Sequence, residues 1–306
     1  MTWLEALLSS GARFTTPILL AGLGCLATRW TKDLNVGLEG AMLFGAFFGV
    51  VTGLSFGSAV QAVVVTASGG AVLGLLFGLL VAGLRANAFV VGTALNVLAA
   101  GATVYLLRTW FGVKGSLGGA EIPALPTLDL GVVARIPLLG PVLSGQSVLT
   151  YVSWLLVVAA VWASRHSILV RHLKASGEHP EALRSAGGNV TRARILAQVW
   201  CFTLCALAGV QLSLGQLSLF TEGMTSGLGF VALAAVIFCR GSAILLAAMS
   251  TAFGLASALS VRLDVTVLPS QFAQMLPYVV AFVGLVVLSR RSRTTDTRII
   301  TPTLEA

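Results

Sequence analysis

Charged side chains are scarce in this sequence. Asp, Glu, Lys and Arg make up 10% of the 306 residues, whereas 57% are hydrophobic and the mean hydropathy is +0.94. A soluble domain carries about 25% charged residues, so this chain cannot cover itself with a polar surface in water. The composition predicts an all-α, polytopic membrane protein whose apolar segments cross a lipid bilayer.

Cysteines and catalytic motifs are also few. The sequence has no G-x-S-x-G, H-E-x-x-H or G-x-x-x-x-G-K-[ST] motif, and its three histidines have no carboxylate or cysteine neighbours at metal-ligand spacing. We therefore predict that the chain is no enzyme and that it holds no metal, cofactor or ATP itself. The four cysteines fall inside apolar segments without C-x-x-C spacing, which is typical of small core residues: Cys25, Cys201, Cys205 and Cys239.

What the sequence does contain is a succession of apolar segments, and spanning a membrane takes about 20 residues. We expect about nine crossings, within a range of eight to ten. Leu228–Cys239 is too short to span, which predicts a broken or re-entrant helix there. Residues 1–14 are predicted to form a separate, short interfacial helix. The expected segments are Thr15–Thr28, Val36–Phe56, Ala59–Leu84, Phe89–Trp110, Val148–Ala163, Ile195–Leu214, Leu228–Cys239, Ala243–Val261 and Phe272–Leu288.

The few charges are distributed unevenly. Six cations and all three histidines lie in residues 165–194, and four arginines lie in residues 290–298. The net charge of +8 therefore fits the positive-inside rule better than nucleic-acid binding, and residues 165–194 and 291–306 are predicted to be a cytoplasmic loop and tail. Residues 112–146 are rich in Gly and Pro with balanced charges, which indicates an extracytoplasmic loop. Residues 1–290 then form a single transmembrane domain.

Polar residues inside the apolar segments are the candidate path residues. In LNVGLEGAMLFGAFFG, Asn35 and Glu39 are four residues apart, which places them on one face if the segment is helical. A carboxylate in a membrane segment should face protein or water. Two interpretations stay open for Glu39: it lines a gate or cavity, or it caps an interfacial turn.

Two further stretches carry polar groups. EGMT at Glu222–Thr225 echoes EGAM at Glu39–Met42, which is a weak sign of an internal structural repeat with interrupted helices. Asn87, Thr93 and Asn96 lie within the apolar run that follows Arg85. They either hydrogen-bond a polar solute in the path or hydrogen-bond neighbouring helices.

A short isolated helix is predicted within the basic loop, over Gly177–Gly188. Pro180 suits a first turn, Glu178 and Glu181 suit the positive N-terminal end, and two glycines provide the stop. An isolated helix of two turns is marginal in water. We therefore expect it to dock on a partner, although a solvated connector is the simpler alternative.

Three stretches in order, LNVGLEGAMLFGAFFG, ASGEHPEALRSAGGNVTRARILA and SLFTEGMTSGLGFVALAAVIFCR, resemble the permease subunits of bacterial ABC importers. The class is that of branched-chain amino acid and ribose permeases, and the nucleoside and simple-sugar group within it is the most similar. The chain departs from the family pattern at residues 28–34 and at Gly188. The resemblance covers roughly Thr15–Arg290.

The resemblance implies a multi-pass protein of the bacterial inner membrane that works in a complex. Its implied partners are cytoplasmic ATP-binding subunits that hold ATP and Mg²⁺, a second and related permease, an extracytoplasmic solute-binding protein and the lipid bilayer. It assigns the loop helix as the element that couples to the ATPase: Gly177, Glu178, Pro180, Glu181, Ala182, Arg184 and Gly187. Together with the polar residues above, it indicates these translocation-path residues: Asn35, Glu39, Asn87, Thr93, Asn96, Glu222 and Phe230.

The function expected from this reading is ATP-driven import of a small polar solute, most of all a nucleoside or related heterocycle. Riboflavin, a simple sugar and an amino acid are the alternative solutes. A secondary transporter coupled to H⁺ or Na⁺ is a second hypothesis, but such proteins place ionisable groups deep in their helices. Here Glu39 and Glu222 lie near segment ends, which counts against it. A membrane scaffold without transport activity is the third hypothesis.

Overall fold

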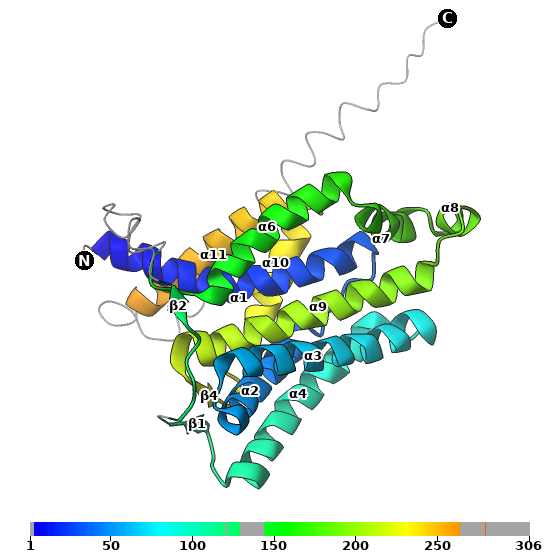
Figure 1. Ribbon diagram of the computed structural model, residues 1–306. Coiled ribbons are helices and arrows are strands. Elements are labelled where there is room, and N and C mark those ends of the chain that lie inside the picture. The colour runs from blue at the N-terminus through cyan, green and yellow to red at the C-terminus, as the bar shows by residue number, and fades with distance from the viewer. Residues whose placement is uncertain (1–2, 120, 129–143, 264–278, 280–306) are drawn as a thin grey trace, which may run out of the picture.

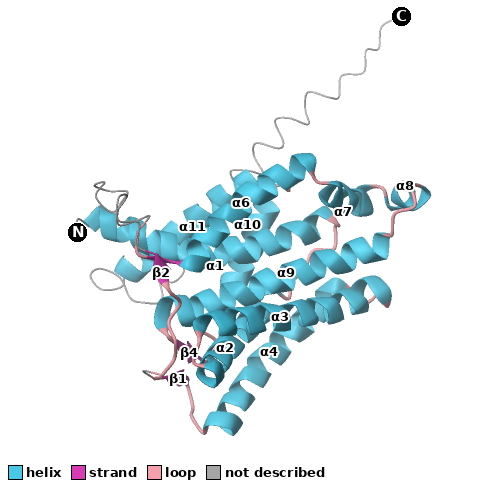
Figure 2. Cartoon of the chain, in the orientation of Figure 1, coloured by secondary structure: helices cyan, strands magenta, loops and turns pink. Residues whose placement is uncertain are grey.

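The structure is a computed structural model that describes residues 3–119, 121–128, 144–263 and 279. Helices make up most of the described chain (Figure 2). Seven of the described helices are long and apolar enough to cross a membrane, which confirms the predicted polytopic helical class. Apart from residue 279, the predicted segment Phe272–Leu288 and the tail 291–306 lie outside the described residues, so the number of nine crossings stays a prediction.

The first half of the chain consists of long helices joined by short connections. Each helix matches an apolar segment of the sequence to within a few residues, apart from the first. The elements are α1 (Trp3–Trp30), α2 (Leu38–Phe56), α3 (Ala59–Gly78), the π-helical turn η1 (Leu79–Gly83) that extends α3, and α4 (Ala88–Phe111).

The second half adds shorter helices to the long ones. The predicted short helix after Leu228 is confirmed, since α10 has 11 residues. The elements are α6 (Val148–His166), α7 (Ile168–Glu178), α8 (Pro180–Ser185), α9 (Val190–Leu212), its π-helical extension η3 (Ser213–Leu217), α10 (Leu228–Phe238) and α11 (Ala243–Leu263).

Two short antiparallel strand pairs occur, and one strand of each lies in residues 112–146, where the sequence predicted only an extracytoplasmic loop. β1 (Ser116–Gly118) pairs with β4 (Leu219–Thr221), and β2 (Thr127–Leu128) pairs with β3 (Gln146–Ser147). The first pair joins the loop after α4 to the connection that follows η3. It therefore ties residues about 100 positions apart in the sequence.

The separate N-terminal helix was predicted wrongly, because α1 runs without a break from Trp3 to Trp30. Pro17 inside it has no N–H to donate to the carbonyl oxygen of Arg13, and such a carbonyl normally marks a kink or an end. Here Gln216 Nε2 donates to that oxygen at 2.8 Å. The helix continues because a side chain from η3 satisfies the backbone group that the proline leaves free.

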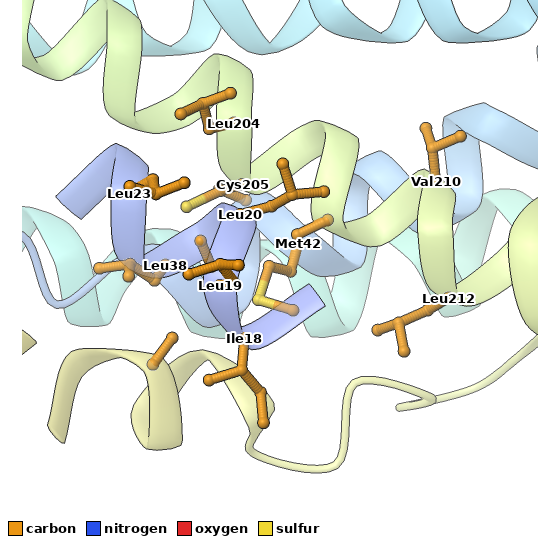
Figure 3. Close-up of a cluster of buried hydrophobic side chains, with 14 of the residues drawn as sticks. Ile18, Leu19, Leu20, Leu23, Leu38, Met42, Leu204, Cys205, Val210 and Leu212 are labelled. Atoms are coloured by element: carbon orange, nitrogen blue, oxygen red, sulfur yellow. The ribbon is translucent and has the colours of Figure 1, made fainter. Parts of the chain in front are cut away.

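The core lies where α1, α2 and α9 cross. α1 and α9 run side by side, with α6 and α11 on one side of them and α3 and α4 on the other (Figure 1). Side chains from all three crossing helices fill the space between them, among them Leu20, Met42 and Cys205 (Figure 3). All four cysteines are buried and free, which confirms their prediction as small core residues.

Close backbone approach allows this crossing. A Cβ placed on Gly209 of α9 would overlap the carbonyl oxygen of Met42, and one on Gly45 of α2 would overlap the backbone of Ala206. Small residues at helix crossings are how membrane helices gain packing energy, since lipid offers no hydrophobic drive for their association.

Candidate translocation and coupling sites

α8 is a six-residue helix at the far edge of the molecule (Figure 1). As predicted, Pro180 is its first residue, and the chain leaves it through Gly187, whose φ of +79° favours glycine. The N–H groups of Gly187 and Gly188 donate to the carbonyl oxygens of Arg184 and Leu183 at 2.9 and 2.8 Å. These two bonds are a Schellman motif, which satisfies carbonyls at the end of the helix.

The predicted bounds Gly177–Gly188 were too wide, because two helices occupy this stretch. Gly177 and Glu178 are the last residues of α7, and α8 begins after His179. Pro180 causes the break: it disfavours the helical conformation for the residue before it, and His179 has φ −139° and ψ 70°. Glu178 therefore lies at a helix C-terminus, not at the N-terminus that the sequence indicated.

The outward side of α8 offers polar groups to a partner. Glu181, Ala182 and Arg184 are exposed, and Glu181 accepts a hydrogen bond from Arg184 at 2.6 Å. Leu183 is buried against the start of α9 and anchors the helix. Such a helix has a fixed position but a free outer face, as a docking element requires.

α7 is tied to the first half of the chain by packing and by charge. A Cβ on Gly177 would overlap the carbonyl oxygen of Trp30, so α7 lies directly against the end of α1. Arg194 Nη2 donates to the carbonyl oxygen of Ser176 at 3.3 Å, and Arg194 Nε lies 3.3 Å from Asp33 Oδ2. Burial raises the pKa of Asp33, and Arg194 opposes that shift. Arg194 thus joins α7 to the connection before α2.

A chain of amide groups continues from there towards α2. Gln198 of α9 donates to the carbonyl oxygen of Asp33 at 3.2 Å and accepts from Asn35 Nδ2 at 3.1 Å. Asn35 in turn accepts the N–H of Gly37 at 2.7 Å, just before α2 begins. Asn35 is fully buried, and it precedes the helix. Asn35 and Glu39 therefore do not share a helical face, because the helix on which that expectation depended begins only at Leu38.

Glu39, in the first turn of α2, binds the start of α10. Its Oε1 accepts hydrogen bonds from Thr225 Oγ1 at 2.6 Å and from the N–H of Gly227 at 2.9 Å. Its Oε2 accepts from the N–H of Gly229 at 2.8 Å. The first N–H groups of a helix lack internal partners and carry partial positive charge. The carboxylate is therefore placed where it satisfies the N-terminus of a short helix.

Asn96 of α4 completes this cluster. Its Oδ1 accepts from the N–H of Gly40 at 2.8 Å, and its Nδ2 donates to the carbonyl oxygen of Val36 at 3.1 Å. The amide thus binds both sides of the start of α2. Of the two interpretations of Asn96, hydrogen bonding between elements is the one that these contacts support.

The remaining predicted path residues make no side-chain hydrogen bond to this cluster within the described part of the chain, although Phe230 directly follows Gly229, which donates to Glu39. Asn87 caps α4 by accepting from the N–H groups of Phe89 and Val90, and Thr93 donates to the carbonyls of its own helix. Glu222 accepts from the N–H of Gly115 at 3.1 Å and lies 3.7 Å from Arg108. Phe230 is 45% exposed on α10. The structure brings together Asn35, Glu39 and Asn96 only.

The echo between EGAM and EGMT does not mark equivalent positions. Glu39 lies inside the first turn of α2, whereas Glu222 lies in the connection before α10. Both helices directly follow a glycine: Gly37 precedes α2 with φ −77°, and Gly227 precedes α10 with φ +82°. The two halves therefore share an architecture of long helix, irregular connection and glycine-initiated helix.

A known protein family matches nearly the whole chain. Residues 7–288 match the family described as "Branched-chain amino acid transport system / permease component". The chain belongs to this permease family. It is therefore an ABC-type transport permease, a multi-pass protein of the inner membrane, and the family is one of transport subunits rather than enzymes.

Three curated relatives of the permease cover most of its length. A protein of Haloferax volcanii, provisionally named a glucose ABC transporter permease, is 31% identical over 86% of this chain and 79% of its own. The guanosine ABC transporter permease protein of Bacillus subtilis is 28% identical over 89% and 88%. The nucleoside ABC transporter permease protein of Lactococcus lactis is 29% identical over 92% of each chain. No solved structure gives a significant match.

Sequence reasoning missed the partners of the predicted path residues. Thr225, Gly227 and Gly229 hold the Glu39 carboxylate, and Gln198 links Asn35 to Asp33. The uncharged polar group of Gln198 inside the apolar run of α9 was a usable signal, because such groups seldom face lipid. Apart from their spacing, Gly227 and Gly229 gave no signal in the sequence that they would bind Glu39.

Proposed function

We propose that this permease is the membrane subunit of an ATP-driven ABC importer that carries nucleosides or related heterocycles. The proposed solute class rests on the names of two of the three relatives above, which state guanosine and nucleosides. Both alignments cover about nine-tenths of both chains. A simple sugar is the runner-up, because the third is provisionally named for glucose.

The proposed mechanism is alternating access driven by a partner ATPase. A solute-binding protein delivers solute from outside, a second, related permease completes the path, and ATP-binding subunits close beneath it. Conformational change requires contacts that differ in free energy between the two states. α8, with its exposed outer face, is the proposed contact for the ATPase, and the bonds through Arg194, Gln198 and Asn35 lead from α7 to α2. On this proposal, α8, the start of α9 and the end of α1 that packs against α7 all lie on the cytoplasmic side.

Uptake tests the proposed function directly. The permease is reconstituted in liposomes with its second permease, its ATPase and its binding protein, and radiolabelled guanosine, adenosine, glucose and leucine are offered. We expect uptake of a nucleoside that requires internal ATP and is insensitive to a protonophore. Uptake of glucose alone would show that the solute is a simple sugar and not a nucleoside. Uptake that continues without ATP and collapses with the proton gradient would identify a secondary transporter instead.

Glu181→Arg is expected to abolish co-purification with the ATPase and to reduce uptake at least about tenfold. Its side chain is 81% exposed, so the change leaves the fold intact while it reverses charge on the docking face and repels Arg184. The ATPase retained on the affinity-tagged permease measures the effect. Glu121→Arg, an exposed residue of the loop between α4 and α6, is the matched control and should retain the ATPase. Normal ATPase retention by Glu181→Arg would contradict a coupling role for α8.

A further inference from the structure

A polar pocket of about 430 Å³ lies on the side of α7 that faces the end of α1. Four cations line it: Arg29 at the end of α1, Lys32 in the connection to α2, Lys174 of α7, and Arg240 between α10 and α11. Among the described residues that line it, the one carboxylate is Glu178. Four positive groups from four separate segments thus converge around one negative group.

These cations have no ionic partners within the described part of the chain. The ion pairs there join Arg108 to Glu222, Arg184 to Glu181 and Arg194 to Asp33. Lys174 instead places its Nζ 5.5 Å from the ring centre of Trp30, a cation–π contact that leaves its charge uncompensated. The pocket therefore has a net positive charge that an anion would neutralise.

Two of the four cations stand where the backbone favours glycine. Lys32 has φ +60° and Arg240 has φ +49°, a left-handed conformation that costs a non-glycine residue free energy and is often retained where the side chain has a function. The neighbour of Arg240 is held in place, because Trp30 Nε1 donates to the carbonyl oxygen of Gly241 at 3.1 Å. The turn and the end of α1 thus form one wall of the pocket.

We propose that this pocket binds the phosphate headgroup of an anionic phospholipid. The pocket lies at the ends of two membrane-crossing helices, α1 and α11, which is the depth of the lipid headgroups, and Trp30 is of the residue type that prefers this interface. Basic pockets between membrane helices on the cytoplasmic side are built to bind anionic headgroups. The inference rests on the orientation given under the proposed function, with α8 on the cytoplasmic side.

A bound headgroup would join three separate segments of the chain. Arg29 belongs to α1, Lys174 precedes α8 by six residues, and Arg240 belongs to the connection between α10 and α11. One phosphate with several oxygens can accept hydrogen bonds from all three. The lipid would then hold α7, and through it α8, against the end of α1.

The test uses the full-length chain in nanodiscs made of equal parts phosphatidylglycerol and phosphatidylcholine. Native mass spectrometry counts the lipid molecules that the released protein retains. We expect the wild type to retain phosphatidylglycerol, and the double variant Lys32→Gly/Arg240→Gly to retain about tenfold less. Both replacements suit the left-handed backbone, so the variant should unfold at or above the wild-type temperature. Arg165→Gln/Arg171→Gln, which removes two exposed cations of α6 and α7 outside the pocket, should retain the lipid as the wild type does.

Four results would overturn the proposal. The first is equal loss of phosphatidylglycerol in both double variants, and the second is that the wild type retains as much phosphatidylcholine as phosphatidylglycerol. The third is loss of the retained lipid when the ATPase is added. The fourth is stabilisation of the wild type by inorganic phosphate in pure phosphatidylcholine nanodiscs. The first indicates diffuse charge, the second lipid retention that does not depend on headgroup charge, the third a protein interface, and the last a soluble phosphate compound. The assay needs no solute and no ATP, so its outcome is separate from that of the uptake test.

Discussion

Replacing Glu39 by alanine is expected to abolish uptake and to lower the free energy of unfolding of the permease by about 2–5 kcal/mol. The change removes the acceptor for Thr225 and for the N–H groups of Gly227 and Gly229. A fully buried donor left without a partner costs about 1–3 kcal/mol, and these three contacts are only part-buried, so their combined cost is lower than three full penalties. Thermal unfolding in detergent and uptake by the reconstituted importer measure the two effects.

Glu39→Gln separates hydrogen bonding from charge. The amide keeps one oxygen for Thr225 and Gly227 but turns an NH₂ group towards the N–H of Gly229, so donor faces donor. We expect an intermediate loss of about 1–3 kcal/mol. Glu222→Gln is the control, because Glu222 is partly exposed and its ion pair with Arg108 spans 3.7 Å; such pairs contribute about 0–1 kcal/mol. Equal effects at Glu39 and Glu222 would show that the contact with α10 has no special importance.

Gly209→Ala is expected to destabilise the permease by about 2–3 kcal/mol and to lower its yield in the membrane. One added methyl group would overlap the carbonyl oxygen of Met42 and lie 2.5 Å from the backbone N of Ala46. Backbone atoms of α2 cannot move aside as a flexible side chain can, so the two helices must separate. Unfolding by SDS in mixed micelles measures the loss.

Gly101→Ala is the matched control for this crossing. Gly101 is exposed on α4, and a Cβ placed on it would meet no atom within 4 Å. Alanine is the better helix former by about 1 kcal/mol, so this variant should be as stable as the wild type or more so. If Gly209→Ala behaves as Gly101→Ala does, the close approach of α2 and α9 does not limit stability.

The sequence predicted those features that depend on local patterns. Apolar length located the long helices, the shortness of the run after Leu228 predicted α10, and Pro180 and Gly187 marked the two ends of α8. Each of these depends on hydropathy or on the backbone preference of one residue, which can be read without knowledge of the fold.

Features that depend on distant partners could not be predicted. The continuity of α1 requires Gln216, which is 203 residues from the carbonyl of Arg13. The contacts of Glu39 with Thr225, Gly227 and Gly229 could not be predicted, because a carboxylate in an apolar run looks the same in sequence whether it lines a path or satisfies a helix N-terminus. The resemblance named the correct family but gave no contact between the two halves.

The bond between Glu39 and α10 has a consequence for the biogenesis of the permease. Glu39 leaves the ribosome 188 residues before Gly227, one of its donors. At about 5–20 residues per second, synthesis of that distance takes roughly 10 to 40 s. During this interval a carboxylate enters the membrane with the start of α2 while its partners do not yet exist, which is costly in lipid. The start of α2 is therefore expected to stay in contact with the insertion machinery or with water during this interval. It packs in its final position only after α10 has been synthesised.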